Sequence, residues 1–326
     1  MFRTLIAIAV NTFTQAIRQP IYGVVIGMTV LIYIFSPSLS MFTIDDDNLL
    51  LRDIGLSTLL VSGLFLAVFT AATVVSDEIE NKTVLTLISK TVSRTIFIIG
   101  KFVGISMAVI LAQYLLTLVL LTMVRQGVMQ TASDESDMVA LSLSIGAGIL
   151  TTLSCLGGSY FYQWRFSSTL VTTATLLMTI VCTLLYFIDR NWTFNPDGHN
   201  LELSLLGPVL LTVFSVLILT AISTALSTRF NTVVTLIVSG IFFILGVALQ
   251  LWLSPIIVSG PEILKWASWA SMTIVPSLNI FVVTNAVYNE ATISLSYIVN
   301  VGLYTCTYIA GTLMFAIALF RSRDVG

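Results

Sequence analysis

The sequence is poor in ionisable residues, and this scarcity excludes several functions. Only 9% of its 326 residues are charged, and it contains one histidine and three cysteines. Because His199 is the sole histidine, a haem held by two histidines is excluded, and neighbouring positions form no metal cluster or catalytic dyad. Cys155, Cys182 and Cys306 all lie in apolar stretches without a CxxC pair, so no disulfide framework is expected. No segment matches GxxxxGK[ST], so the chain has no P-loop of its own.

Apolar residues are abundant instead. The hydrophobic share is 57% and the mean hydropathy is +1.01, far above the usage of soluble proteins. Apolar runs of about twenty residues recur along the chain, and each is long enough to cross a bilayer as a helix. We therefore predict an all-α, polytopic membrane protein with a single transmembrane domain over residues 1–326 and no nucleic-acid partner. The eight predicted spans cover residues 21–41, 55–75, 102–123, 139–162, 169–188, 203–226, 233–253 and 295–320.

Residues 1–19 combine apolar and polar positions at helical spacing. Phe2, Ile6 and Phe13 alternate with polar residues such as Asn11 and Gln15. This pattern is typical of an amphipathic helix that lies in the membrane interface. A signal peptide is the alternative, but the apolar core is short and no small-residue cleavage site follows it.

The distribution of basic residues predicts the topology. If the N-terminus is cytoplasmic, all but four of the 14 basic residues fall on the cytoplasmic side. This is the bias expected of membrane proteins, and an even number of spans returns the C-terminus to the same side. The sequence thus predicts a multi-pass protein of the cell membrane with both termini in the cytoplasm. The four outer basic residues would be Arg52, Arg125, Arg190 and Lys265.

Residues 76–101 form a charged stretch between two apolar spans. Asp77 and Glu80 indicate a helix start of the capping-box type, and Glu78 lies four residues before Lys82, a spacing that supports the first turn. Charged residues at this density do not lie in lipid. We predict a helix on the cytoplasmic face, with one apolar side formed by Ile79, Val84, Leu85 and Ile88.

Residues 254–294 form the longest predicted outer connection. They contain Pro255, Pro261 and Pro276, together with an apolar stretch at 274–287 that is too short to span. One interpretation is a pair of short helices that dip into the outer leaflet and cap a pathway, since irregular backbone at that depth must be buried in protein or face water. The other is an ordinary amphipathic surface loop, which the composition fits equally well.

The interiors of the predicted spans contain no Asp, Glu, Lys, Arg or His. Ion-coupled carriers keep ionisable groups there, so this class is disfavoured. Polar residues that remain inside the spans, such as Gln113, Gln250 and Asn300, are typical of hydrogen bonds between helices.

The charged stretch resembles the cytoplasmic loop of type-2 ABC exporter permeases, in which an acidic pair, a Thr and an apolar helix precede a Ser-Arg and a Gly-Lys. Residues 275–281 and 319–324 are similar to the outer re-entrant helix and the closing tail of the same family, especially its multicopper-enzyme-maturation branch. Two features depart from the family: Thr91 replaces a usual Pro, and residues 139–188 add a hairpin to the usual six spans. The positions that match in the loop are Asp77, Glu78, Glu80, Lys82, Thr83, Leu87, Ser93, Arg94, Gly100 and Lys101.

The resemblance implies a permease subunit without catalytic residues or metal ligands. Two such subunits, identical or related, would sit over two separate ATP-binding subunits, which alone would bind ATP. The alternative is a non-transporting scaffold or mechanotransmitter that passes ATPase strokes to an outer partner. The implied ATPase-coupling residues are Asp77, Glu78, Glu80, Lys82, Thr83, Arg94 and Lys101, and those of the outer re-entrant segment are Pro276, Asn279 and Phe281.

Overall fold

The computed structural model describes residues 2–40, 47–76, 93–128, 136–195, 198, 200–259, 261–283 and 293–321. Over these residues the chain is helical and forms no strand, apart from one isolated antiparallel bridge between Ile188 and Phe194. Eight helices are long and apolar enough to cross a membrane, and each corresponds to one predicted span. The chain is therefore a multi-pass, all-α membrane protein, as the sequence predicts.

The spans are α2 (Pro20–Ser40), α3 (Asp47–Ala71), α6 (Arg94–Gln126), α7 (Met138–Tyr162), α8 (Phe166–Phe187), α9 (Leu206–Ser227), α10 (Thr232–Ser259) and α13 (Leu295–Arg321). The remaining helices are α1 (Phe2–Ile17), the π-helical turn η1 (Ala72–Ser76) that continues α3, the 3₁₀ turns η2 (Leu203–Leu205) and η3 (Leu278–Phe281), and α11 (Glu262–Ile274).

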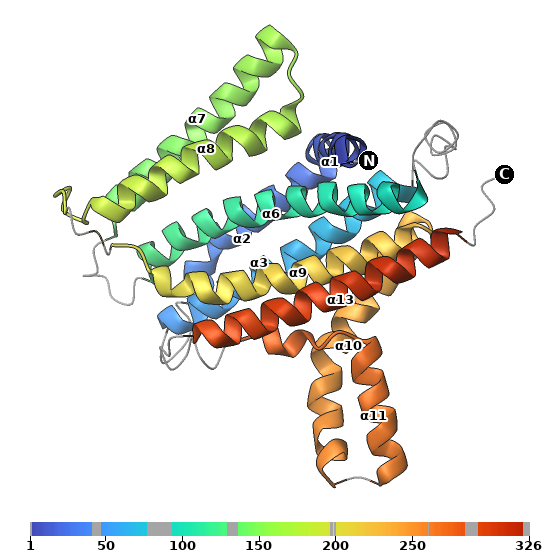
Figure 1. The fold of residues 1–326 in the computed structure, drawn as a ribbon. Coiled ribbons are helices and arrows are strands. Elements are labelled where there is room, and N and C mark those ends of the chain that lie inside the picture. The colour runs from blue at the N-terminus through green and yellow to red at the C-terminus, as the bar shows by residue number, and fades with distance from the viewer. Residues whose placement is uncertain are drawn as a thin grey trace.

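Three helices form the centre of the bundle. In α3, α6 and α9, 67% of the residues in the most apolar part of the span are buried within the protein. In the other spans this share is 28% or less. Leu59, Leu116 and Val216 bring these three helices into one fully buried cluster. Helices α6, α9 and α13 run side by side (Figure 1).

Two central helices begin earlier than the sequence predicts. The second span was expected to start at residue 55 and the third at residue 102, but α3 starts at Asp47 and α6 at Arg94. Ser93 caps α6, since its hydroxyl accepts the Ile96 N–H at 3.3 Å. The extra turns carry charged residues that have partners within the protein, so polarity alone did not mark the helix ends.

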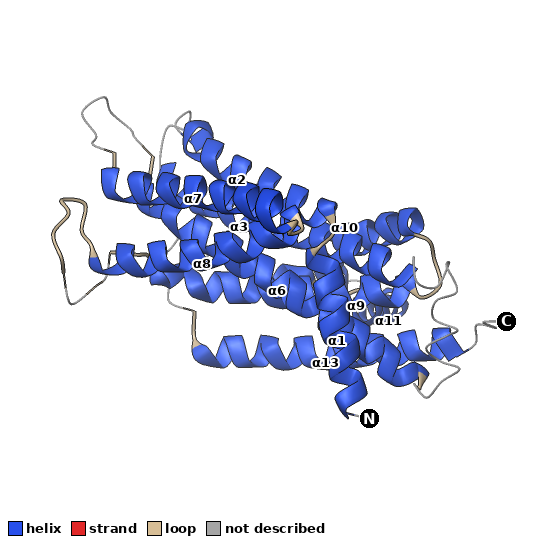
Figure 2. Cartoon of the chain, turned by 90° about the horizontal axis from the view of Figure 1, so that it is seen from above, coloured by secondary structure: helices blue, strands red, loops and turns tan. Residues whose placement is uncertain are grey.

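Helix α1 crosses the first half of α6, as Figures 1 and 2 both show. The contact is close because α6 carries Gly100 and Gly104 there. A Cβ atom at Gly104 would lie 2.5 Å from the carbonyl oxygen of Ala9, so a larger residue would displace α1. Phe2 and Val10 are exposed on the other side of α1. We call this end of the long helices the α1 end; α6 begins there and α13 ends there (Figure 1).

The predicted extra hairpin is present as α7 and α8. Helix α8 packs against α6 and α2, whereas α7 packs mainly against α8 and exposes Ile145, Ile149 and Leu153. At the end opposite α1, the Arg125 side chain donates to the Asp137 carboxylate at 2.8 Å, and both side chains are almost fully buried. Arg125 also donates to the carbonyl oxygens of Leu185 and Ile188. One arginine therefore joins the end of α6 to both helices of the hairpin.

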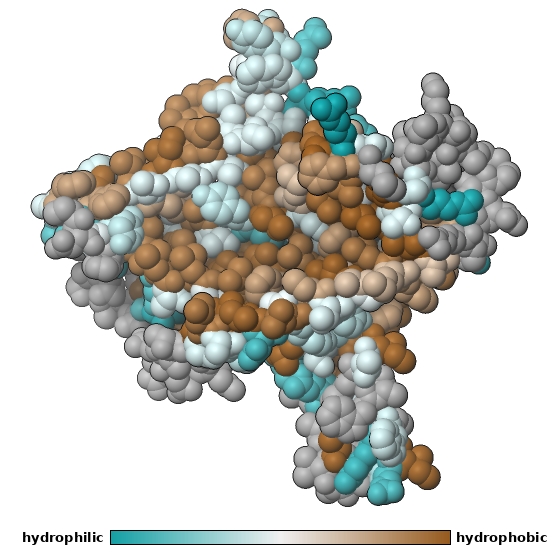
Figure 3. All heavy atoms as spheres, viewed as in Figure 1, coloured by the Kyte–Doolittle hydropathy of each residue, from teal (hydrophilic) through white to brown (hydrophobic). Residues whose placement is uncertain are grey.

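Helices α10 and α11 form a hairpin that projects from the body of the bundle (Figure 1). Helix α10 extends to Ser259, six residues beyond the predicted end of its span. Figure 3 shows that the surface over the long helices is broadly apolar on this face, while hydrophilic residues gather near the ends of the bundle and on the projecting hairpin. An apolar surface of this extent suits a protein that is surrounded by lipid.

Candidate functional site

The α1 end brings together the two helices between which residues 77–92 are inserted. Helix α3 ends there in η1, and α6 starts at Arg94. The Lys101 ammonium of α6 donates to the carbonyl oxygen of Val74 in η1 at 3.5 Å, and its Nζ lies 5.7 Å from the centre of the Phe97 ring. Lys101 is only 2% exposed. A buried cation thus links the last turn of α3 to the start of α6.

The π-helical turn η1 makes a second contact at this end. The Thr73 hydroxyl donates to the Oε1 atom of Gln19 at 2.7 Å, and Gln19 lies between α1 and α2. Single π-helical turns are frequent at functional sites. Here η1 connects α3 to α6 and to the α1–α2 junction.

The predicted coupling residues are only partly covered by the structure. Asp77, Glu78, Glu80, Lys82 and Thr83 lie outside the described residues. Arg94 and Lys101 are described, and both contact other helices. The Arg94 guanidinium lies 3.5 Å from the carbonyl oxygen of Phe320 and 5.9 Å from the centre of its ring.

These contacts give the two basic residues different places in the site. Arg94 joins the start of α6 to the end of α13, whereas Lys101 is in the protein interior. The buried Lys101 therefore connects α6 with η1.

Residues 275–283, which we call the return segment, lead from α11 back into the bundle. Pro276 is buried, Leu278 is fully buried and Phe281 is 2% exposed, while Asn279 is half-buried in η3. Gly246 of α10 permits this approach, since a Cβ atom there would lie 2.7 Å from the carbonyl oxygen of Pro276. Of the two interpretations of the sequence, an ordinary surface loop does not fit these residues.

Three tyrosines of α13 hold the irregular backbone around the return segment. The Tyr308 hydroxyl donates to the carbonyl oxygen of Ile274 at 2.8 Å, and the Tyr297 hydroxyl donates to that of Ile280 at 2.6 Å. The Tyr304 hydroxyl accepts the Ser277 N–H at 3.1 Å. Backbone groups that no helix satisfies are costly in an apolar environment, so these hydroxyls stabilise the segment inside the bundle.

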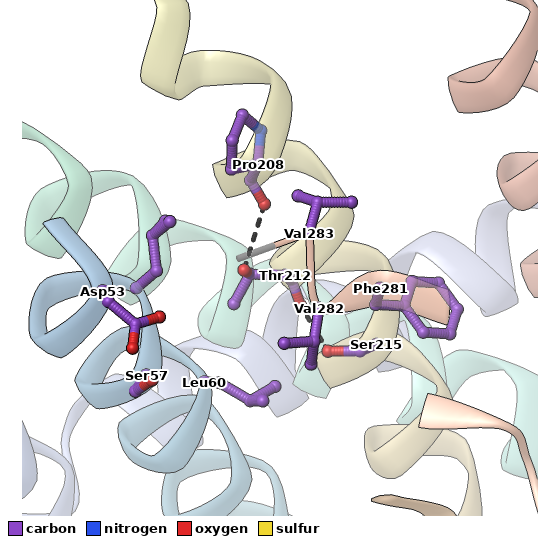
Figure 4. Close-up of a pocket in the computed structure, with 10 residues that line it drawn as sticks. Asp53, Ser57, Leu60, Pro208, Thr212, Ser215, Phe281, Val282 and Val283 are labelled. Carbon is purple, nitrogen blue, oxygen red and sulfur yellow. Dashed lines mark hydrogen bonds between the residues drawn. The ribbon is translucent and has the colours of Figure 1, made fainter. Parts of the chain in front are cut away.

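A small cavity lies where the return segment meets α3 and α9 (Figure 4). Its volume is about 30 Å³, which is room for a water molecule. The Thr212 hydroxyl donates to the Pro208 carbonyl at 3.0 Å, and the Ser215 hydroxyl to the Thr212 carbonyl at 2.8 Å. Asp53 and Ser57 of α3 line the opposite wall. The return segment therefore covers a small gap between two central helices, lined mainly by apolar side chains.

The sequence did not predict the buried Arg125–Asp137 ion pair or the hydrogen bonds of the three α13 tyrosines to residues 274–280. Arg125 lies just after the predicted span 102–123, and Asp137 lies just before the predicted span 139–162. Opposite charges at these two positions could have indicated an ion pair. Tyr297, Tyr304 and Tyr308 are separated by seven and four residues, so they share one face of a helix. No protein-family model matches the chain, and no curated protein matches it.

Proposed function

We propose that the chain is the membrane-spanning permease subunit of an ABC-type exporter, driven by a separate ATP-binding subunit that docks on residues 77–92. The observation that supports this most directly is the linkage at the α1 end. The insertion leaves from η1 and returns to α6, and Lys101 joins these two elements through the Val74 carbonyl. A displacement of the insertion would therefore act on α3 and α6 together.

Helix α3 provides a route from the α1 end to the opposite end. Asp53 and Ser57, near its beginning, line the cavity that the return segment covers, whereas its last turn is η1. A helix transmits a shift along its axis, and close-packed interfaces move between discrete arrangements rather than deforming smoothly. In the proposed mechanism, ATP-driven movement of the docked subunit tilts α3 and changes how the return segment seats against α9.

The remaining partners follow from the same proposal. A second permease subunit, identical or related, would complete the pathway, and ATP would be bound by the partner subunits alone. The acidic residues Asp77, Glu78 and Glu80, with Lys82 and Thr83, would form the contact with the ATP-binding subunit. Charged groups favour orientation and the apolar side of the segment favours a groove, which is the combination a docking helix needs.

The test is to replace Glu78 and Glu80 singly by Gln. They lie two residues apart, about 200° around a helix, so they do not face the same groove and the effects should be unequal. Loss of a charge-assisted contact worth about 1.5 to 3 kcal/mol weakens association about tenfold or more. We expect at least one variant to lower co-purification of the ATP-binding subunit from the same genome, together with permease-stimulated ATP hydrolysis.

The matched control is Glu262→Gln, because Glu262 is an exposed acid on α11, away from the α1 end. This variant should insert into the membrane and retain both activities. If the Glu78 and Glu80 double variant also inserts normally and leaves co-purification and hydrolysis unchanged, docking through this segment is wrong.

A further inference from the structure

A large cavity opens on the side of the bundle between α9, α10, the end of α11 and α13. Its volume is about 630 Å³, within the range of pockets that hold small molecules. Leu226, Phe242, Ile274, Tyr304 and Phe315 are among the residues that line it. It is distinct from the small cavity beneath the return segment.

The hydroxyl groups on the α13 wall of this cavity already have partners. Tyr308 donates to the Ile274 carbonyl and Tyr304 accepts the Ser277 N–H. The Thr307 and Thr312 hydroxyls donate to the carbonyl oxygens of Leu303 and Tyr308 within α13 itself. The wall therefore presents methyl groups and aromatic rings rather than hydrogen-bonding groups, and a polar ligand would lose hydration there without compensation.

The cavity opens toward the membrane rather than into the centre of the protein. Phe315 is 60% exposed and Ile274 is 68% exposed. Two of the three spans that border it, α10 and α13, are the least buried of the eight, with 17% of the residues in the most apolar part of each buried, whereas α9 forms the inner wall. In a multi-pass membrane protein such a surface is in contact with lipid, so the surrounding molecules with matching chemistry are acyl chains.

We propose that this cavity binds an acyl chain of a bilayer phospholipid, which fills the space between α13 and the base of the α10–α11 hairpin. An empty space of this size would deprive its lining of packing contacts, and a flexible chain restores them. The bound chain would also hold the end of α11 in place, near the Tyr308–Ile274 hydrogen bond. This proposal requires only that the protein is embedded in a membrane, so it is independent of the proposed transport function.

Gly311 offers a way to close the cavity without disturbing the protein. It lines the cavity, and a Cβ atom there would meet no other atom within 4 Å. Gly311→Phe should therefore place its ring in the space that the acyl chain occupies. Gly148→Phe on α7 is the matched control, since it has the same open surroundings but lies outside the cavity.

The experiment reconstitutes the purified full-length chain in phosphatidylcholine carrying a nitroxide near the end of one acyl chain. Electron paramagnetic resonance then counts the chains whose motion is restricted by the protein. We expect Gly311→Phe to lose one restricted chain per protein relative to Gly148→Phe, with both variants eluting as the unmodified protein does. Equal counts for the two variants would overturn the proposal.

A second measurement identifies the occupant. Phosphatidylcholine with a photoreactive diazirine in its acyl chain should label peptides containing residues 304–315, and Gly311→Phe should reduce this labelling several-fold. If a diazirine fatty acid labels these residues and the phospholipid does not, the site takes free fatty acids and the phospholipid assignment is wrong. If neither lipid labels them and Thr312→Cys instead forms disulfide-linked dimers, a second copy of the chain occupies the cavity.

Discussion

Two charged side chains are buried in the bundle because they pair with each other. These are Arg125 and Asp137, with side chains that are 4% and 0% exposed. Asp137 additionally accepts the Ala140 N–H at 2.9 Å and thereby caps α7. Removing one partner of a buried pair leaves an uncompensated charge, which costs more than the pair itself contributes.

We predict that Arg125→Met destabilises the protein by about 3 to 5 kcal/mol, because the buried Asp137 carboxylate loses the cation that donates to it at 2.8 Å. The midpoint of unfolding in sodium dodecyl sulfate measures this effect. Arg190→Gln is the control: Arg190 lies 3.8 Å from the same carboxylate but its side chain is 62% exposed, so its loss should cost less than about 1 kcal/mol. Equal unfolding midpoints for the two variants would contradict a stabilising role of the Arg125–Asp137 pair.

At the residue scale, the sequence indicated that a polar side chain makes a contact between helices, but not which atom accepts its hydrogen bond. Gln113 was predicted to hydrogen-bond between helices, and this is confirmed: its Nε2 donates to the Leu59 carbonyl at 3.1 Å in the buried interface of α6 with α3. Lys101 was predicted to be one of the ATPase-coupling residues, and this stays a prediction; within the chain it is buried and donates to the Val74 carbonyl of η1. No residue type in the sequence marks a backbone acceptor such as the Val74 carbonyl.

At the scale of elements, periodicity and length predicted which helices exist, and packing decided where they end and how they lie. The eight spans could be predicted, since the length and apolar composition of each can be read from the sequence. The burial of the return segment could not, because it depends on Gly246 facing Pro276 and on tyrosines of a helix that follows later in the chain.

The burial of the return segment in the bundle can be tested with a cysteine at Phe281. Phe281 is 2% exposed, so Phe281→Cys should react slowly with a bulky water-soluble maleimide. Adding Gly246→Leu should accelerate labelling at least tenfold, because the new side chain occupies the space of Pro276 and Leu278. Gly148→Leu, where the added side chain meets open space, should leave the rate unchanged. Fast labelling of Phe281→Cys alone would show that the segment is solvated.

At the scale of the whole molecule, the structure ties distant loops to one end of the bundle. The Ser167 hydroxyl, in the first turn of α8, lies within hydrogen-bond distance of the carbonyl oxygens of Ile17 at 3.1 Å and Gln19 at 3.0 Å. The turn between α7 and α8 therefore lies beside α1. Whichever side of the membrane holds α1 must also hold Arg165, because both belong to the same packed end.

The charge bias predicts which side this is, and it yields the last prediction. The opposite orientation would place most of the 14 basic residues outside, against the bias that sets membrane topology. In a variant whose three native cysteines are Ala, Arg165→Cys and Arg229→Cys should therefore react with an impermeant maleimide only after the membrane is permeabilised. Trp192→Cys should react in intact cells, since Trp192 is 59% exposed at the opposite end. If Arg165→Cys is labelled from outside while Arg229→Cys stays protected, α7 and α8 do not both cross the membrane. The contact of the Ser167 hydroxyl with the end of α1 would then also be wrong.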